Sequence, residues 1–262
     1  MARLDAELVS RAAAQSRERA KEMIKSGGVR VNGAVITKPS AVISEGDEIE
    51  ILEADIQYVG RGALKLEKAA EEFDLSFDGK VCLDIGASTG GFTDFMLRNG
   101  AAKVYAVDVG HGQLAPSLRA DSRVVNAEGT DIREVTTEFI GGGVDFISAD
   151  VSFISLKKIL PKMYELLKPD ACAAVLIKPQ FEAGRENVGK KGIVKDRRVH
   201  VKVLQDINSF AESIGFCTEK YTYSPVKGGS GNIEYLVKLV KSESSGVQHD
   251  FRELAELAFK QL

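Results

Sequence analysis

The stretch Val81-Cys-Leu-Asp-Ile-Gly-Ala-Ser-Thr-Gly-Gly-Phe92 decides the fold of this chain. It joins a short apolar run, a glycine-rich turn and the start of a helical pattern, in the order strand, turn, helix. This geometry brings backbone N–H groups and a helix N-terminus close to a bound ligand. The next apolar run, 104–108, ends in Asp108, where a carboxylate can bind the hydroxyl groups of a ribose. The stretch therefore predicts a cofactor at the edge of an α/β sheet, and the alternative is a tight turn without a ligand.

Apolar runs continue along the chain and alternate with helical stretches. The predicted strands are 81–85, 104–109, 124–127, 144–149, 171–177, 218–223 and 234–240, and the predicted helices are 93–99, 156–167 and 199–214. Continuous apolar strands that alternate with helices are typical of a parallel sheet buried on both faces. A glycine-rich turn separates the last two strands and predicts an antiparallel pair at one edge. The expected fold is a Rossmann-like α/β domain with a seven-stranded, mostly parallel sheet.

A small α+β unit is expected before this domain, over residues 1–54. Residues 16–25 predict an amphipathic helix, which is followed by short β segments at 29–31, 34–37 and 47–52. An Asn32-Gly33 turn between apolar pairs is a strong hairpin signal.

Composition and charge exclude several classes of protein. With 44% apolar and 28% charged residues among 262, the chain is typical of soluble globular proteins. No apolar run approaches the roughly 20 residues of a membrane helix, and the amino terminus lacks the apolar segment of a secretory signal. Three scattered cysteines form neither a metal knuckle nor a disulfide framework. We therefore expect a reduced, cytoplasmic protein with no membrane segment and no metal site.

The glycine turn favours S-adenosylmethionine over a dinucleotide. Its pattern is G-x-S-x-G-G instead of G-x-G-x-x-G, and an acid, Asp84, precedes the first glycine by two residues. The cationic ammonium and sulfonium groups of S-adenosylmethionine favour nearby carboxylates. After the third strand, Asp131 is expected to reach the adenine amino group, or else only to cap a turn. The predicted cofactor-binding residues are Asp84, Gly86, Ser88, Gly90, Gly91, Asp108 and Asp131.

Four charged residues stand at unusual places, and we name them the tetrad: Lys65, Asp150, Lys178 and Glu234. Asp150 and Lys178 directly follow apolar strands, and ligands of open α/β sheets gather at the carboxyl ends of strands. A charge in such a place is expected to be partly buried, and hence paired or functional. The alternative for each residue alone is a surface ion pair.

The tetrad favours methyl transfer to a hydroxyl group. A ribose 2′-hydroxyl is a poor acid, and a partly desolvated lysine near a second lysine can accept its proton. We expect Lys178 to be this base, Asp150 to orient its amine, and Glu234 to hold the hydroxyl or the second lysine. Base N-methylation typically uses an Asn/Asp-Pro-Pro-aromatic segment, but residues 150–153 read Asp-Val-Ser-Phe. Methylation at C5 of a pyrimidine needs a cysteine in the cleft, and Cys82, Cys172 and Cys217 lie within or at the starts of strands.

These residues resemble two known groups of proteins. The tetrad resembles that of FtsJ-like ribose 2′-O-methyltransferases, and the closer resemblance is to the TlyA (haemolysin A-like) rRNA methyltransferase family. The segments that carry it are 60–66, 84–93, 150–155, 178–182 and 190–194. Residues 1–54 resemble the S4-type (αL) RNA-binding module through 16–21, 28–33 and the Gly46-Asp47 pair.

The resemblance implies both an organisation and an activity. It divides the chain into an S4-type domain at 1–54, a linker at 55–60, an FtsJ-like domain at 61–245 and a carboxy-terminal helix at 246–262 packed on that domain. It implies S-adenosylmethionine-dependent 2′-O-methylation of cytidine in ribosomal RNA, with the amino-terminal module docking on a ribosomal subunit. Family members differ in whether they modify the RNA of one subunit or of both, and that alternative stays open, as does the oligomeric state.

Two basic clusters are expected to bind the RNA. One lies on the helix at 16–25 and its surroundings, and the other, the basic loop, spans 184–202 directly after Lys178. The predicted RNA-binding residues are Arg17, Lys21, Lys25, Arg30, Arg185, Lys190 and Lys191. A solvated helix face and a plain surface loop are the alternatives. Two rival functions are a non-enzymatic RNA- or ribosome-binding factor, which the intact tetrad disfavours, and a haemolysin-like protein, which the lack of a spanning segment disfavours.

Overall fold

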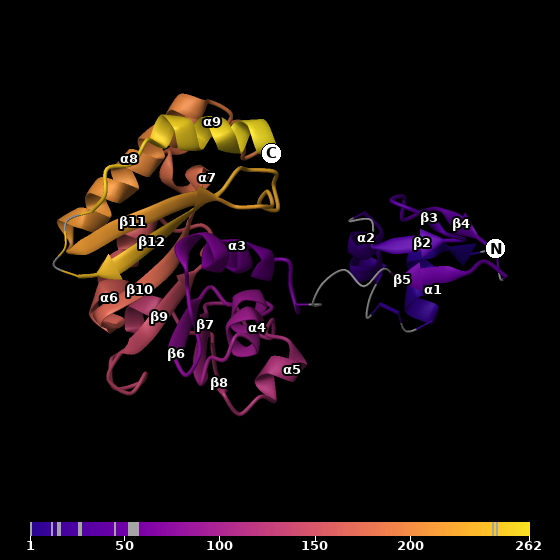
Figure 1. Cartoon of the computed structure of the whole chain (residues 1–262), viewed down its shortest axis with the longest axis horizontal. Helices are drawn as coiled ribbons and strands as arrows, with labels where there is room; N and C mark the ends of the chain where they lie inside the picture. The colour runs from indigo at the N-terminus through magenta and orange to yellow at the C-terminus, as the bar shows by residue number, and fades with distance from the viewer. Residues whose placement is uncertain are drawn as a thin grey trace. The chain divides into compact units, whose positions relative to one another are not determined.

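The computed structural model describes residues 2–11, 13–14, 17–25, 28–44, 46–51, 58–242, 244 and 246–262. The chain divides into two compact units, Met1–Gln57 and Tyr58–Leu262 (Figure 1). Of the predicted linker at 55–60, residues 55–57 lie outside the described part.

The larger unit is built on one seven-stranded sheet in the order β11-β12-β10-β9-β6-β7-β8. Its strands are β6 (Val81–Ile85), β7 (Lys103–Asp108), β8 (Val124–Glu128), β9 (Val144–Ala149), β10 (Leu167–Ile177), β11 (Phe216–Tyr223) and β12 (Tyr235–Lys241). The strands from β10 to β8 are parallel, whereas β12 runs antiparallel to both β10 and β11. The predicted seven-stranded, mostly parallel sheet with an antiparallel pair at one edge is confirmed.

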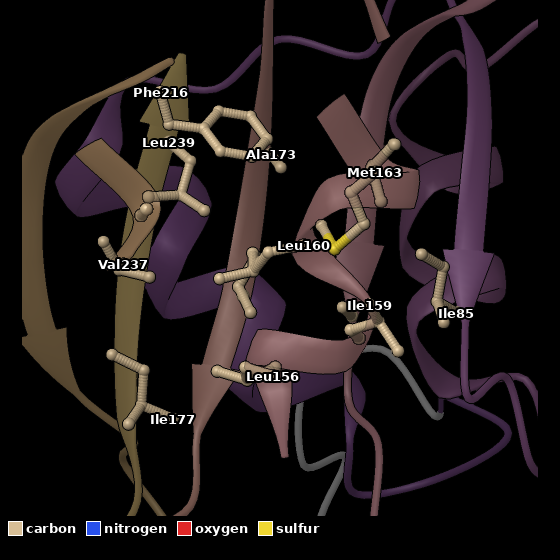
Figure 2. Close-up of a cluster of buried hydrophobic side chains, with 14 of the residues drawn as sticks. Ile85, Leu156, Ile159, Leu160, Met163, Ala173, Ile177, Phe216, Val237 and Leu239 are labelled. Carbon is tan, nitrogen blue, oxygen red and sulfur yellow. The ribbon is translucent and has the colours of Figure 1, made fainter. Parts of the chain in front are cut away.

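Helices cover both faces of this sheet (Figure 1). One face packs against α3 (Ala63–Phe73), α4 (Gly91–Arg98) and α5 (Pro116–Arg119), and the other against α6 (Leu160–Leu166), α8 (Arg197–Ser213) and α9 (Phe251–Gln261). Successive strand residues alternate between the two cores, so that Phe146 belongs to the first and Ile147 to the second. Figure 2 shows the second core, where Leu160 and Met163 of α6 lie among side chains of the strands.

One predicted helix differs from the structure, and one observed helix has no predicted counterpart. The helix expected at 156–167 is a 3₁₀ turn (Leu156–Lys158) followed by α6, because Pro161 lies in the first turn of α6 and lacks the N–H of a helix interior. Helix α3 is absent from the predicted elements, although Ala63, Leu66 and Phe73 are buried at helical spacing. The short helices α7 (Pro179–Glu182), Ile132–Glu134 and Arg185–Asn187 complete the unit.

The smaller unit combines two helices with short antiparallel strands. Its elements are β1 (Ala2–Arg3), α1 (Leu4–Ser10), α2 (Arg17–Lys25), β2 (Val29–Val31), β3 (Ala34–Val35), β4 (Val42–Ile43) and β5 (Ile49–Ile51). The strands pair as β3-β2-β5 and β1-β4, around a core that includes Leu8, Ile24 and Val29. Asn32 and Gly33 have φ angles of 50° and 80°, as the tight turn predicted between β2 and β3 requires. Across the described part of both units, no helix is long and apolar enough to cross a bilayer.

Candidate active site

The candidate site lies where the strand order reverses, between β6 and β9. The chain runs outward from β6 through β7 to β8, and then returns to place β9 on the other side of β6. Such a reversal opens a crevice at the carboxyl ends of the strands. The backbone N–H of Asp150, just after β9, donates to the Ile85 carbonyl at 2.9 Å. A Cβ atom at Gly86, where φ is +80°, would lie 2.5 Å from the Asp150 carbonyl oxygen, so this turn requires glycine.

The tetrad forms one chain of ion pairs beside this turn. Asp150 is its centre, because one carboxylate oxygen lies 2.5 Å from Lys178 Nζ and the other lies 3.0 Å from Lys65 Nζ. Lys65 Nζ also donates to Glu234 Oε2 at 2.8 Å. Lys178 Nζ has a second contact, a hydrogen bond to Ser152 Oγ at 3.0 Å. Residues from four separate segments thus form one chain, in which each lies within hydrogen-bond distance of the next.

Burial and opposite charge act against each other in this cluster. The side chains of Lys65, Lys178 and Glu234 are 11%, 9% and 3% exposed. Burial alone would lower the pKa of Lys65, but the adjacent carboxylates of Asp150 and Glu234 outweigh it and raise that pKa. Burial alone would raise the pKa of Asp150, but the two lysines outweigh it and lower that pKa. Lys65 is therefore a cation and Asp150 an anion at neutral pH. The two lysines, which are expected from the sequence to be neighbours, are separated in the structure by the carboxylate of Asp150.

Lys65 reaches the cluster because α3 packs tightly on the start of α4. A Cβ atom at Gly91, in the first turn of α4, would lie 3.0 Å from the backbone nitrogen of Ala63. A Cβ atom at Gly60 would lie 2.6 Å from the Thr89 hydroxyl oxygen. These glycines let the two segments approach, and Lys65 then stands two residues into α3, next to the glycine turn.

A cleft of about 520 Å³ runs from the tetrad across the ends of β6, β7 and β8. Its lining includes Gly86, Ser88, Asp108, Asp131 and Phe153. The Asp108 carboxylate accepts hydrogen bonds from the backbone N–H groups of Ser88 at 2.8 Å and Gly110 at 2.7 Å. Because a carboxylate has about four acceptor positions, Asp108 keeps capacity for the hydroxyl groups of a ligand. Gly90 lies outside this lining, and it has the left-handed conformation that begins α4.

Two predicted cofactor residues have other contacts. Asp131 accepts from the backbone N–H of Arg133 at 2.9 Å, and it forms an ion pair with the Arg133 side chain at 2.5 Å. These contacts correspond to the turn-capping alternative, and a contact of Asp131 with adenine stays a prediction. Asp84 is fully buried, and its oxygens accept from Thr93 Oγ1 at 2.7 Å and Ser148 Oγ at 3.0 Å. Its carboxylate supports the glycine turn from inside the fold, which strand periodicity alone does not reveal.

Burial of Asp84 predicts a pH effect on stability. Burial raises its pKa to about 6, so the folded chain binds more protons than the unfolded chain between pH 4 and 6. The contribution of Asp84 to the free energy of unfolding therefore falls as the pH rises through this range, by about 2–3 kcal/mol. Asp84→Asn lacks this fall, so relative to the unmodified chain it gains stability from pH 4 to pH 7. Urea unfolding of both proteins at pH 4 and pH 7 tests this. If the difference in the free energy of unfolding between the two proteins is the same at both pH values, the prediction is contradicted.

An aromatic pair that no sequence pattern indicates lies next to the tetrad. Phe153 is 91% exposed and has a φ angle of 63°, which is rare for an aromatic residue. Its ring centroid lies 5.0 Å from that of Phe181 in α7, whose ring is 6.0 Å from Lys178 Nζ. Both residues stand in the segments quoted for the family resemblance, but their exposure and contact follow only from the tertiary structure.

The predicted RNA-binding residues have different environments. In the larger unit, Arg185, Lys190 and Lys191 are exposed on the basic loop. The loop predicted at 184–202 is shorter in the structure, because Asp196 caps α8 and residues 197–202 are the first turns of that helix. In the smaller unit, Arg17 donates to the fully buried Asp5 at 3.0 Å. Arg30 pairs with Glu50 at 3.4 Å, Lys21 is half-buried, and the side chain of Lys25 lies outside the described part.

Two known families match the chain, one over each unit. Residues 58–241 match the FtsJ-like methyltransferase family, and residues 2–49 match the S4 domain. The chain belongs to the FtsJ-like methyltransferase family. The resemblance inferred from the tetrad and the glycine turn is confirmed, and so is the S4 domain of this methyltransferase.

Similar proteins cover nearly all of this FtsJ-like methyltransferase. It is 49% identical over 238 residues to the "Putative rRNA methyltransferase YqxC" of Bacillus subtilis, across 90% of this chain and 85% of that protein. It is 44% identical to the "16S/23S rRNA (cytidine-2'-O)-methyltransferase TlyA" of Mycobacterium tuberculosis, across 91% and 89% of the two chains. A solved structure, "Putative hemolysin from Streptococcus thermophilus", is 43% identical, with a TM-score of 0.79 over 99% of this chain and 96% of that one.

Proposed function

We propose that this methyltransferase transfers a methyl group from S-adenosylmethionine to the ribose 2′-hydroxyl of cytidine in ribosomal RNA. The observation that carries the proposal is the buried ion-pair chain Glu234–Lys65–Asp150–Lys178 at the mouth of the cleft. Such a cluster provides one amine next to a fixed anion, which suits the removal of a proton from a weakly acidic hydroxyl. The names of the relatives support the same substrate.

The residues of the cleft fit S-adenosylmethionine. The glycine turn approaches Asp150 so closely that a side chain at Gly86 would collide with the Asp150 carbonyl. Because residue 86 is glycine, no side chain covers the backbone there, and a ligand can approach it. Asp108 would hold the ribose hydroxyl groups, and the surfaces of Val109 and Ile132 line the cleft for the adenine. Ser88 and Gly86 would face the part between adenosine and the tetrad. When bound, the cofactor supplies an electrophilic methyl group on a cationic sulfur.

Cofactor affinity should depend on Asp108. Asp108→Ala is expected to lower the affinity for S-adenosylmethionine at least about tenfold, because hydrogen bonds to a charged acceptor are worth about 1.5–3 kcal/mol each. Asp121→Ala is the matched control, since Asp121 likewise accepts the N–H of the residue two positions later, at 2.9 Å, but does not line the cleft. Calorimetric titration of both variants decides the matter. Equal affinities in the two variants would remove Asp108 from the cofactor site.

Within the tetrad, Lys178 would accept the proton of the 2′-hydroxyl. Lys65 is bound by two carboxylates and stays charged, so it holds Asp150 and Glu234 in place. Asp150 orients the Lys178 amine, and it stabilises the ammonium that forms when the proton arrives. The Ser152 hydroxyl fixes the amine from a second direction.

The exposed ring of Phe153 offers a surface for the base of the target nucleotide. It lines the cofactor cleft and pairs with Phe181, so a base that stacks on it would bring its ribose close to Lys178. Aromatic stacking of this kind is common in the recognition of unpaired RNA bases.

RNA binding would use the basic loop and the S4 domain. Lys190, Lys191 and Arg185 are exposed and would contact phosphates near the target nucleotide. On the S4 domain, Arg17, Lys21, Lys25 and Arg30 would contribute the sequence-independent attraction to a ribosomal subunit.

Transfer of tritiated methyl groups to unmodified ribosomal subunits tests the proposed function. We expect incorporation that depends on the protein, and an alkali-resistant linkage at cytidine that identifies 2′-O chemistry. Separate small and large subunits as substrates show whether one or both are modified. Binding of RNA without incorporation would favour a non-enzymatic ribosome-binding factor, and methylation of a base would exclude the proposed chemistry.

A further inference from the structure

A buried side-chain amide binds the basic loop directly behind its two lysines. Val194 follows Lys190 and Lys191 and is 3% exposed. Its backbone N–H donates to Asn232 Oδ1 at 3.0 Å, and Asn232 Nδ2 donates to the Gly192 carbonyl at 2.8 Å. Because one partner is a donor and the other an acceptor, the neutral amide satisfies both, whereas a carboxylate has no hydrogen to donate.

Asn232 is itself fixed to the segment that carries Glu234. Asn232 is 1% exposed, and its backbone carbonyl accepts a hydrogen bond from the Gly228 N–H at 2.9 Å. The Gly231 N–H donates to the Gly228 carbonyl at 2.7 Å, which closes a tight turn. Glu234 packs on this turn so closely that a Cβ atom at Gly228 would lie 2.2 Å from its carboxylate oxygen. Asn232 and Glu234 therefore belong to one rigid turn.

A second buried contact links the same loop residue, through His200, to Tyr235, which directly follows Glu234. His200 Nε2 lies 2.9 Å from the Val194 carbonyl, which only accepts, so Nε2 carries the hydrogen. Nδ1 then accepts from the Tyr235 hydroxyl at 2.9 Å. Burial lowers the pKa of His200, which keeps the ring neutral in this arrangement. Val194 is thus linked directly to Asn232 before Glu234 and, through His200, to Tyr235 after it.

We propose that Asn232 is a positioning residue that fixes the segment Lys190–Val194 to the turn of Glu234, so that RNA phosphates bound by the loop set the target ribose against the tetrad. The inference rests on the proposed function. Its physical reason is that displacement of a reacting group by about 1 Å can cost about 100-fold in rate. A loop joined by hydrogen bonds to the turn that carries Glu234 transmits the position of the RNA to the tetrad, whereas an unattached loop only raises the affinity for RNA.

Asn232→Asp tests the proposal with almost no change in volume. The substitution places a carboxylate oxygen against the Gly192 carbonyl, so the loop should detach from the turn. We expect kcat/KM for ribosomal subunits to fall about 10- to 100-fold, and the affinity for S-adenosylmethionine to stay within about twofold. Asn99→Asp is the matched control, because Asn99 Nδ2 donates to the Phe95 carbonyl at 2.8 Å on an exposed helix end. The control should keep full activity.

Combining Asn232→Asp with alanine at Lys190 and Lys191 separates positioning from a general loss of stability. If Asn232 acts through the lysines, their removal costs much less in the Asn232→Asp background than in the unmodified chain. Additive losses, or unchanged kcat/KM in Asn232→Asp, would overturn the proposal.

Hydrogen exchange provides a readout that does not depend on methyl transfer. We expect the amides of 189–194 and 228–236 to exchange faster in Asn232→Asp, and those of α4 and β7 to be unchanged. If the unmodified chain methylates no RNA, the proposed function fails, and exchange alone then decides whether Asn232 joins the two segments. Unchanged exchange in both segments would overturn that link.

Discussion

Lys178→Ala is expected to lower the rate of methyl transfer at least about 100-fold, while cofactor and RNA still bind with nearly normal affinity. The reason is that Lys178 is the amine that Asp150 and Ser152 orient at the end of β10, and alanine leaves no group to take the proton. Lys178→Arg should not restore activity, because a guanidinium stays protonated. Tritiated methyl incorporation under single-turnover conditions measures the effect.

A matched control for this prediction lies at the amino ends of the same two strands, β10 and β9. Lys168 lies near the start of β10, and Lys178 directly follows the end of that strand. Lys168 pairs with Asp145 on β9 at 2.7 Å. It thus repeats the lysine–aspartate pair of β10 and β9 away from the cleft. Lys168→Ala should keep normal activity. Full activity of Lys178→Arg would refute the role as base and leave Lys178 as a positioning cation.

Asp150→Asn is expected to cost both stability and activity. The substitution removes the single anion between Lys65 and Lys178, so two largely buried lysines lose their shared partner, although Lys65 keeps Glu234. Breaking a buried ion pair from one side typically costs about 3–5 kcal/mol. We expect a loss of this order in the free energy of unfolding at pH 7, measured with urea, together with loss of methyl transfer.

Asp145→Asn is the control for this second prediction. Its carboxylate pairs with one lysine and its side chain is 30% exposed, so its loss should cost less than about 1 kcal/mol. Equal destabilisation by the two substitutions would mean that the position of Asp150 between the lysines has no special energetic weight.

Much of this arrangement can be predicted from local sequence. The strands of the sheet are apolar runs bounded by turns, and parallel strands bring their carboxyl ends to one edge. Asp150 and Lys178 directly follow such runs, so their meeting beside the glycine turn follows from the pattern. The glycine turn after β6 and the place of Asp108 at the end of β7 follow from the patterns at 81–92 and 104–108.

The sequence by itself determines the strands, the sheet and the residue types at the carboxyl ends of the strands, because these depend on periodicity and on neighbours along the chain. Only the tertiary structure decides which charges meet. Lys65 is 85 residues from Asp150 and 169 from Glu234, and no local pattern joins residues at such distances. The burial of Asp84 and the exposure of Phe153 likewise depend on what packs against each residue. Burial, and with it the pKa values of the site, is a property of the assembled layers.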